Sequence, residues 1–334
     1  MLFRTLLPVL LAILALSPSA TAQSTVKNQK RLSIKKEKKK VKRSKAMRPK
    51  TARKHLAEKG IQPENYDKAL IEYLEKGDCK TAAALIHAGA AINASGDEKK
   101  PLLLAAEHCT PEIIQMLLDK GADRECVDIQ PRPRCMSMGK TAIFMAAKAN
   151  NLENLKYLHK MGFSCTARTK DFMQSHTVLA EAARHGSLEC VRYIIEQGGG
   201  NPHETFPGGA NLMHRAAYSG NVELIKYLDS LGVDMNRLAT GYGLTPLCFA
   251  GQKGHQEAMQ YMLSRGANPN TDLGRNGMHT LFVLAYTANT QTMQMLVKSG
   301  ANFSLKNNEG KGVRDFAKMT NNQEAIDFLD KHKL

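Results

Sequence analysis

The sequence predicts an all-α solenoid built from short helix–turn–helix units, and three regularities support this fold class. Glycine-containing turns recur from Gly89 to Gly300, separated by 32, 41, 36, 34, 34 and 34 residues. A second turn lies twelve residues before each of these glycines. An apolar helical pattern fills the interval, as in Leu224, Ile225 and Leu228. Repetition with a period of roughly 20 to 50 residues is typical of stacked arrays.

The first helix of each unit is expected to carry small residues that allow its neighbours to approach closely. Paired alanines occupy this position at 105–106, 146–147, 182–183 and 216–217. Glycine at the end of each second helix suits a left-handed terminus. We expect residues 64–75 to form an N-terminal capping helix and residues 310–329 a shortened polar unit, because a stacked array needs polar ends.

Two segments resemble the ankyrin repeat family. Residues 245–250, Thr-Pro-Leu-Cys-Phe-Ala, are similar to its T-P-L-H-x-A signature, and residues 254–257 and 266–270 are similar to the stretches that follow it. Residues 211–217 and 220–223 repeat the match. The resemblance covers residues 65–334, with seven repeats and a terminal cap. It implies an all-α ankyrin repeat solenoid with loop or β-hairpin connections, and a module that binds proteins.

The positive charge of the chain is concentrated in one segment. The formal net charge is +16, and residues 27–59 contain sixteen Lys/Arg against two acidic residues, or +14. From residue 60 onward the balance is +1, which argues against a basic nucleic-acid groove on the folded part. A run of like charges indicates a disordered arm or, alternatively, an anion-binding segment.

The N-terminus has the pattern of a secretory signal peptide. One positive charge, an apolar run over 6–16 and a small-residue end at Ala20-Thr21-Ala22 predict cleavage before Gln23. The predicted domains are the signal peptide at 1–22, a basic disordered arm at 23–63 and the repeat array at 64–334. We expect an exported protein, periplasmic or secreted, from a bacterial source. Lysines soon after the apolar run favour retention instead, since such charges tend to stay cytoplasmic.

The seven cysteines allow two candidate disulfides. Cys126 and Cys135 flank the segment that makes the third unit too long, and Cys79 and Cys109 fall at the inner turns of neighbouring units. Disulfides form in oxidising compartments, and the alternative is that every cysteine is a reduced thiol. No metal site is expected, since no Cys-x-x-Cys or paired histidine spacing occurs. No catalytic motif was found, so we expect neither an enzyme nor a cofactor.

A partner is expected on the concave face, because the resemblance implies that the ends of the first helices line that face. The two residues before each inner turn form a series that we call the inner row. The inner row comprises Glu107, His108, Lys148, Ala149, Arg184, His185, Tyr218, Ser219, Gln252, Lys253, Tyr286 and Thr287. The loop tips add Phe172, Phe206, Tyr242 and Arg275. Tyrosine and arginine are enriched at binding hot spots; the alternative is an ordinary solvated surface.

Two functions remain open. The first is an exported monomeric scaffold that binds a protein on its concave face. The second is a binder of anionic polymer or of a membrane surface, such as lipopolysaccharide, glycan or nucleic acid, through residues 27–54. A third option, an enzyme regulator or effector, differs from the first only in the identity of the partner.

Overall fold

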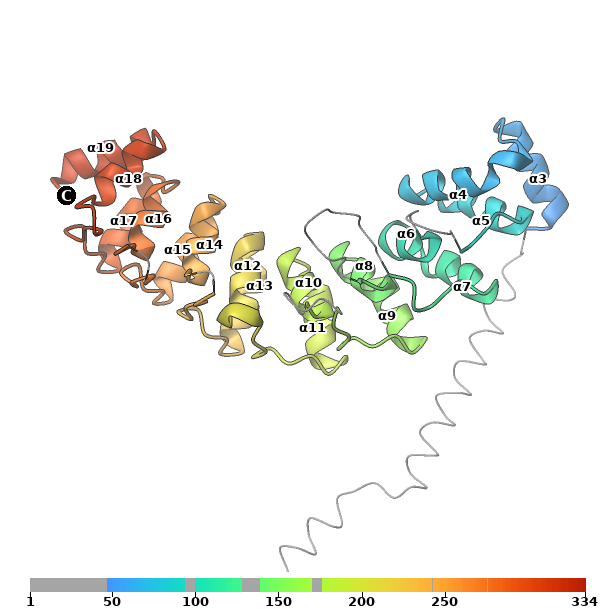
Figure 1. Ribbon diagram of the computed structural model, residues 1–334, viewed down its shortest axis with the longest axis horizontal. Coiled ribbons are helices and arrows are strands. Elements are labelled where there is room, and N and C mark those ends of the chain that lie inside the picture. Colours follow the sequence, from blue (N-terminus) through green and yellow to red (C-terminus); the bar gives the residue numbers. More distant parts are fainter. Residues whose placement is uncertain (1–46, 94–99, 128–138, 170–175, 242, 275) are drawn as a thin grey trace, which may run out of the picture.

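The computed structural model describes residues 47–93, 100–127, 139–169, 176–241, 243–274 and 276–334. These residues form seventeen α-helices and two short 3-10 turns, and no strand occurs among them. The helices stack side by side into a curved array (Figure 1). The all-α solenoid predicted from the repeat spacing is therefore confirmed. The predicted signal peptide and residues 23–46 of the arm lie outside the described residues.

Sixteen of the helices form eight consecutive pairs. The first helices of the pairs lie on the inside of the arc in Figure 1, and they are α4 (Tyr66–Glu75), α6 (Pro101–His108), α8 (Ala142–Lys148), α10 (Val178–Arg184), α12 (Leu212–Ser219), α14 (Pro246–Gln252), α16 (Thr280–Ala285) and α18 (Val313–Met319). The second helices lie outside, and they are α5 (Cys79–Ala88), α7 (Pro111–Asp119), α9 (Leu152–Lys160), α11 (Leu188–Glu196), α13 (Val222–Ser230), α15 (Gln256–Ser264), α17 (Thr290–Lys298) and α19 (Gln323–His332).

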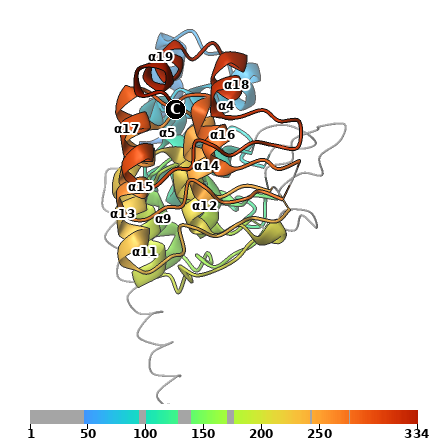
Figure 2. The ribbon, with the colours of Figure 1, turned by 90° about the vertical axis from the view of Figure 1, so that its left-hand side faces the viewer.

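The connections between pairs project to one side as a third layer (Figure 2). Isolated antiparallel bridges narrow four of these loops, at Arg168–Thr177, Thr205–Asn211, Ala239–Leu244 and Asp272–His279. The 3-10 turn η2 (Pro207–Gly209) sits at the end of one loop, and η1 (Pro63–Asn65) leads into α4. The loops therefore have the hairpin-like character that the resemblance implied.

The boundary predicted between arm and array is wrong, because part of the arm is helical. Helix α3 (Pro49–Glu58) packs on α5, and its Ala52 and Leu56 side chains are completely buried. Two apolar residues four positions apart give the helix one buried face, while its basic side chains remain exposed. Helix α3 therefore caps the array, and α4, predicted to be the cap, is the first helix of the first pair.

Asparagine side chains join several repeats to the one before them. The Asn221 side chain accepts a bond from the Leu224 amide, which starts α13, and its Nδ2 donates to the Gly186 carbonyl at 2.7 Å. Asn154 is completely buried, and its Nδ2 donates to the carbonyls of Ala106 (3.0 Å) and Cys109 (2.8 Å). These bonds satisfy carbonyl groups that the end of a helix leaves unpaired. The same side chains thus stabilise the helix ends and the stacking of repeats.

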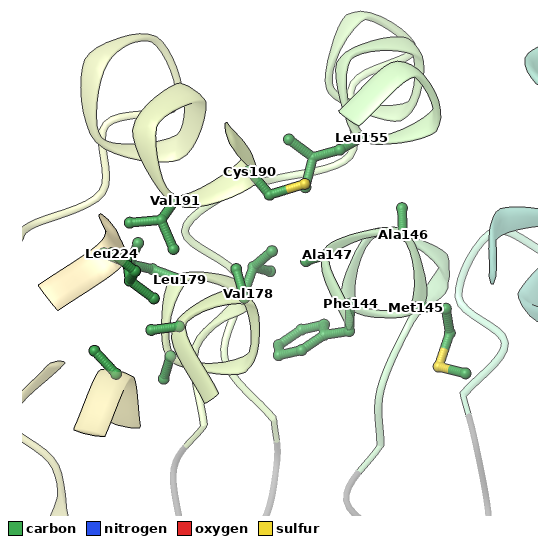
Figure 3. Packing of buried hydrophobic residues seen from close by; sticks show 14 of the residues in the cluster. Phe144, Met145, Ala146, Ala147, Leu155, Val178, Leu179, Cys190, Val191 and Leu224 are labelled. Atoms are coloured by element: carbon green, nitrogen blue, oxygen red, sulfur yellow. The ribbon is translucent and has the colours of Figure 1, made fainter. Parts of the chain in front are cut away.

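The core is a continuous layer of apolar side chains between successive pairs. Figure 3 shows Phe144 of α8 facing Val178 of α10, with Leu155 and Cys190 from the outer helices closing the space above. All four side chains are almost completely buried. Alanine on the first helices, such as Ala146, lets neighbouring helices pack closely. Each repeat therefore buries its apolar face only by stacking on its neighbours.

His214 connects two adjacent loops through its two ring nitrogens. Its Nδ1 accepts a bond from the Asn211 amide at 3.1 Å, while Nε2 lies 3.3 Å from the Leu244 carbonyl in the next loop. Burial lowers the pKa of His214 to about 4. The neutral ring therefore links two adjacent loops.

Gly220 ends α12 at a turn that lies very close to the inner turn of the next unit. Its φ of 74° is left-handed, and a Cβ placed on it would lie 2.5 Å from the His255 ring. The imidazole Nε2 of His255 in turn lies 3.1 Å from the Tyr218 carbonyl. The ring of the sixth unit therefore fills the space that a side chain at position 220 would need.

Candidate functional site

The inner row forms cross-repeat contacts along the inside of the arc. Lys148 Nζ at the end of α8 lies 2.7 Å from Glu107 Oε1 at the end of α6. The next three units bring Arg184, Tyr218 and Lys253 together. Most members of the inner row are exposed or half-buried, as a binding surface requires. The structure thus places these predicted residues on one surface, and that surface follows the first helices.

Tyr218 lies at the centre of this surface between two cations. The Arg184 guanidinium lies 5.3 Å from the centre of the Tyr218 ring, and Lys253 Nζ lies 4.4 Å from it. Hydrogen bonding from Lys253, and then from Arg184, lowers the pKa of the phenol. We call these three residues the Tyr218 clamp. Among the described residues, no carboxylate forms an ion pair with Arg184 or Lys253.

The remaining predicted members of the inner row differ in their surroundings. His108 and Gln252 are exposed. Exposed His185 lies 3.3 Å from the carboxylate of Glu181. Tyr286 is half-buried and packs edge-on against Phe316 of the terminal unit. The row therefore has a cationic middle and a more apolar C-terminal end.

A buried ion pair lies directly beneath the middle of the row. Glu181 of α10 is completely buried, and its Oε1 lies 2.6 Å from Lys140 Nζ. Burial alone would raise the pKa of Glu181, but hydrogen bonds from His185 and Lys140 outweigh it and hold this pKa at about 2. The carboxylate is therefore charged at neutral pH. Its Oε1 is paired inside the protein, its buried Oε2 has no hydrogen-bond partner among the described residues, and neither oxygen forms an ion pair with the Tyr218 clamp.

Only one of the four predicted loop-tip residues lies in the part of the chain that the structure describes. Phe172, Tyr242 and Arg275 lie outside the described residues. The prediction that Phe206 is an exposed contact residue is wrong, because its side chain is 5% exposed. Arg215 explains this burial, since its guanidinium lies over the Phe206 ring at 5.4 Å from the centre.

Two residues of the inside surface were missed from the sequence. Phe249 of α14 lies edge-on to Tyr218, with the ring centres 6.4 Å apart, and Arg215 occupies the equivalent position on α12. Both stand at the variable position of the T-P-L-H-x-A signature and are half-buried. Three residues separate this position from the inner row, nearly one helical turn, so the spacing could have identified them.

The cysteines differ in their suitability for pairing. Cys79 and Cys109 are both free thiols and lie close together, and burial followed by the nearby Cys79 thiol raises the pKa of Cys109. Cys126 is buried, whereas Cys135 lies outside the described residues. Cys190 and Cys248 are completely buried, as expected for small apolar residues in the core. Both candidate disulfides stay predictions.

Neither a metal centre nor a membrane span is found in the part of the chain that the structure describes. No group of three or more His, Cys, Asp or Glu residues there is arranged to hold a metal ion. No helix there is both long and apolar enough to cross a bilayer. The surface that stands out among the described residues is therefore the inside of the arc.

These features define a class of protein, a solenoid of stacked helix pairs with a polar and aromatic inner surface. The chain belongs to the ankyrin repeat family. The model for "Ankyrin repeats (3 copies)" matches it in overlapping segments at residues 70–169, 128–206, 144–239, 179–273 and 213–307. Ankyrin repeats are generally protein–protein interaction modules.

The chain is similar to short parts of two larger proteins. It is 27% identical over 143 residues to the ankyrin repeat and KH domain-containing protein mask-1 of Caenorhabditis elegans, which is 43% of this chain and 5% of that protein. It is 29% identical over 129 residues to the probable E3 ubiquitin-protein ligase XBOS33 of Oryza sativa subsp. japonica, covering 38% and 23% of the two chains. The matches thus span less than a quarter of either relative.

A solved structure agrees with the fold. The crystal structure of the human ASB11 ankyrin repeat domain matches with a TM-score of 0.54 and 22% identity, over 66% of this chain and 92% of that chain. At this identity the likeness shows the fold alone.

Proposed function

We propose that this protein is an exported, non-enzymatic scaffold that binds a protein partner on the inside of its arc. The observation that carries the proposal is the continuous inner surface around the Tyr218 clamp, which combines tyrosine, phenylalanine and arginine. Tyrosine and arginine are enriched at binding hot spots, and phenylalanine is enriched at the core of protein interfaces. Export, a periplasmic or secreted location and a monomeric state are parts of the proposal that rest on the sequence.

Obstruction of the inside surface tests this proposal without altering charge. Ala149 and Gln252 are exposed on the inner row, so A149W/Q252W adds bulk there while leaving the core intact. Q291W/Q294W places the same bulk on two exposed positions of α17, an outer helix. We expect partners captured by the full chain from the exported fraction to be lost with the first variant and kept with the second. Equal capture by both variants would refute the proposal.

The alternative function, binding of an anionic polymer or membrane surface through residues 27–54, is favoured by one observation. The basic side chains of α3, Lys50, Arg53 and Lys54, are all exposed. Because α3 is part of the packed array, a deletion of residues 27–54 would damage the fold. Deleting residues 27–46 and introducing K50Q/R53Q/K54Q is the sharper test. We expect retention on anionic vesicles to fall steeply with salt and to vanish in this variant if the arm binds.

A further inference from the structure

The Tyr218 clamp brings two positive charges from different repeats onto one neutral phenol. Arg184 comes from the end of α10 and Lys253 from the turn after α14, and Tyr218 lies between them on α12. Each cation approaches the ring, yet the described residues offer neither an ion-pair partner. Two like charges directed at one group repel each other, and an anion placed between them offsets this repulsion.

Carboxylates near the clamp are already engaged. Glu181 is completely buried and bonded to Lys140, while Glu107 is paired with Lys148 at 2.7 Å. Some cations that lie over tyrosine rings in other repeats are paired with a carboxylate, although Lys156 over Tyr193 is not paired with one among the described residues. On the outer helices, Arg192 and Lys226 also lie over tyrosine rings, but Glu196 and Glu223 neutralise them.

Apolar surface adjoins the two cations. Phe249 lies edge-on to Tyr218, with the ring centres 6.4 Å apart, and both side chains are half-buried. A partner that places a carboxylate between Arg184 and Lys253 would therefore meet an aromatic surface beside it. Charge-assisted hydrogen bonds from arginine and lysine to carboxylates are roughly twice as strong as neutral ones.

We propose that the Tyr218 clamp binds an acidic segment of the protein partner, with Asp or Glu carboxylates between Arg184 and Lys253 and an apolar side chain against Phe249. The inference rests on the proposed function and deepens it, because it states the chemistry of the partner. A neutral or basic segment would leave the two cations without a counter-charge at the centre of the interface. Rim charges set the rate of association, whereas charges at the centre set its specificity.

The test is selection from a random 12-residue peptide display library on the full chain at about 0.15 M salt, where long-range attraction to the arm is screened beyond ~8 Å. Selected peptides are then measured by fluorescence anisotropy against the wild type and two double variants. R184Q/K253Q removes the charges of the clamp. R192Q/K226Q is the matched control, since it removes one arginine and one lysine from above tyrosine rings on the outer helices and leaves the same net charge.

We expect selected peptides to be enriched in Asp and Glu, to bind R184Q/K253Q at least tenfold more weakly, and to bind R192Q/K226Q within twofold of the wild type. The single variant K253Q, at an exposed position, is expected to weaken binding in the same direction. Peptides that show no excess of Asp or Glu, or that lose equal affinity with both double variants, would overturn the inference.

The outcome separates this inference from the proposed function. Peptides that A149W/Q252W blocks but that R184Q/K253Q does not affect would preserve binding on the inside of the arc and refute an acidic partner. Peptides that A149W/Q252W does not affect would refute both.

Discussion

The buried ion pair between Glu181 and Lys140 provides the sharpest test of how the array is held together. The Glu181→Gln substitution keeps the shape of the side chain and removes its charge, leaving the largely buried Lys140 without a carboxylate. The pKa of Glu181 is about 2, against 4.5 for an ordinary glutamate. Each tenfold change in proton affinity is worth about 1.4 kcal/mol. The surroundings of this carboxylate therefore stabilise the folded state by about 3 kcal/mol at neutral pH.

The sign of the pH dependence follows from the lowered pKa. The folded state holds Glu181 charged more strongly than the unfolded chain does, so its contribution is complete above pH 4.5 and is lost as the pH falls towards 2. The difference in stability between the wild type and E181Q is therefore expected to be large at pH 7 and to narrow by pH 3.

Local hydrogen exchange is the suitable assay, because a long repeat array does not unfold in a single two-state step. A loss of about 3 kcal/mol corresponds to roughly 150-fold faster exchange of amides in α8 and α10, after correction for intrinsic rates. The control is Glu223→Gln, whose exposed partner Lys226 lies 2.7 Å away; exposed pairs contribute less than about 1 kcal/mol. The reasoning would be refuted if the amides of α8 and α10 in E181Q exchanged within threefold of their wild-type rates at pH 7. It would also be refuted if the difference in exchange rate did not narrow at pH 3.

Three further predictions concern the ends and joints of the array. Burial lowers the pKa of His214 from 6.5 to about 4. The urea concentration at the unfolding midpoint is therefore expected to decrease as the pH is lowered from 6.5 to 4, and to decrease less in His214→Gln. An equal decrease in both proteins would contradict this prediction. Leu56→Ala removes a completely buried side chain and is expected to lower the free energy of unfolding by about 2–5 kcal/mol. Amide hydrogen exchange should become faster in α3 and α5 and stay unchanged in α15. An equal increase in α15 would count against capping by α3. In glutathione disulfide, Cys79 and Cys109 are expected to form a disulfide with release of two glutathione thiols. This is seen as a loss of two protein thiols, counted after glutathione is removed, that Cys79→Ser prevents; an unchanged count of protein thiols would exclude the bond.

The repeat spacing predicted most of the fold because the glycine turns are strong local signals. Gly232, Gly266 and Gly300, for example, all adopt the left-handed conformation expected of them. Helix α3 was not predicted, because its two buried residues, Ala52 and Leu56, are surrounded in the sequence by basic residues that indicate a disordered arm. Its burial depends on contact with α5, which no local pattern encodes.

The candidate site was predicted in position but not in its interactions. The spacing to the inner turns identified Arg184, Tyr218 and Lys253 as members of one row. Their convergence depends on the stacking angle between repeats, which the sequence does not state. Phe206 was misplaced for a related reason, because the Arg215 side chain that lies over it comes from a helix that follows the loop.

The contact between Gly220 and His255 limits how the units of this chain can be exchanged. A Cβ at position 220 would force the His255 imidazole to move from the place it occupies against this turn. Among the other inner turns, Gly254 leaves 3.9 Å to the next unit, so the tight fit does not belong to every joint. We therefore expect the fifth and sixth units to be inherited, and to be transplanted in engineered arrays, as one block.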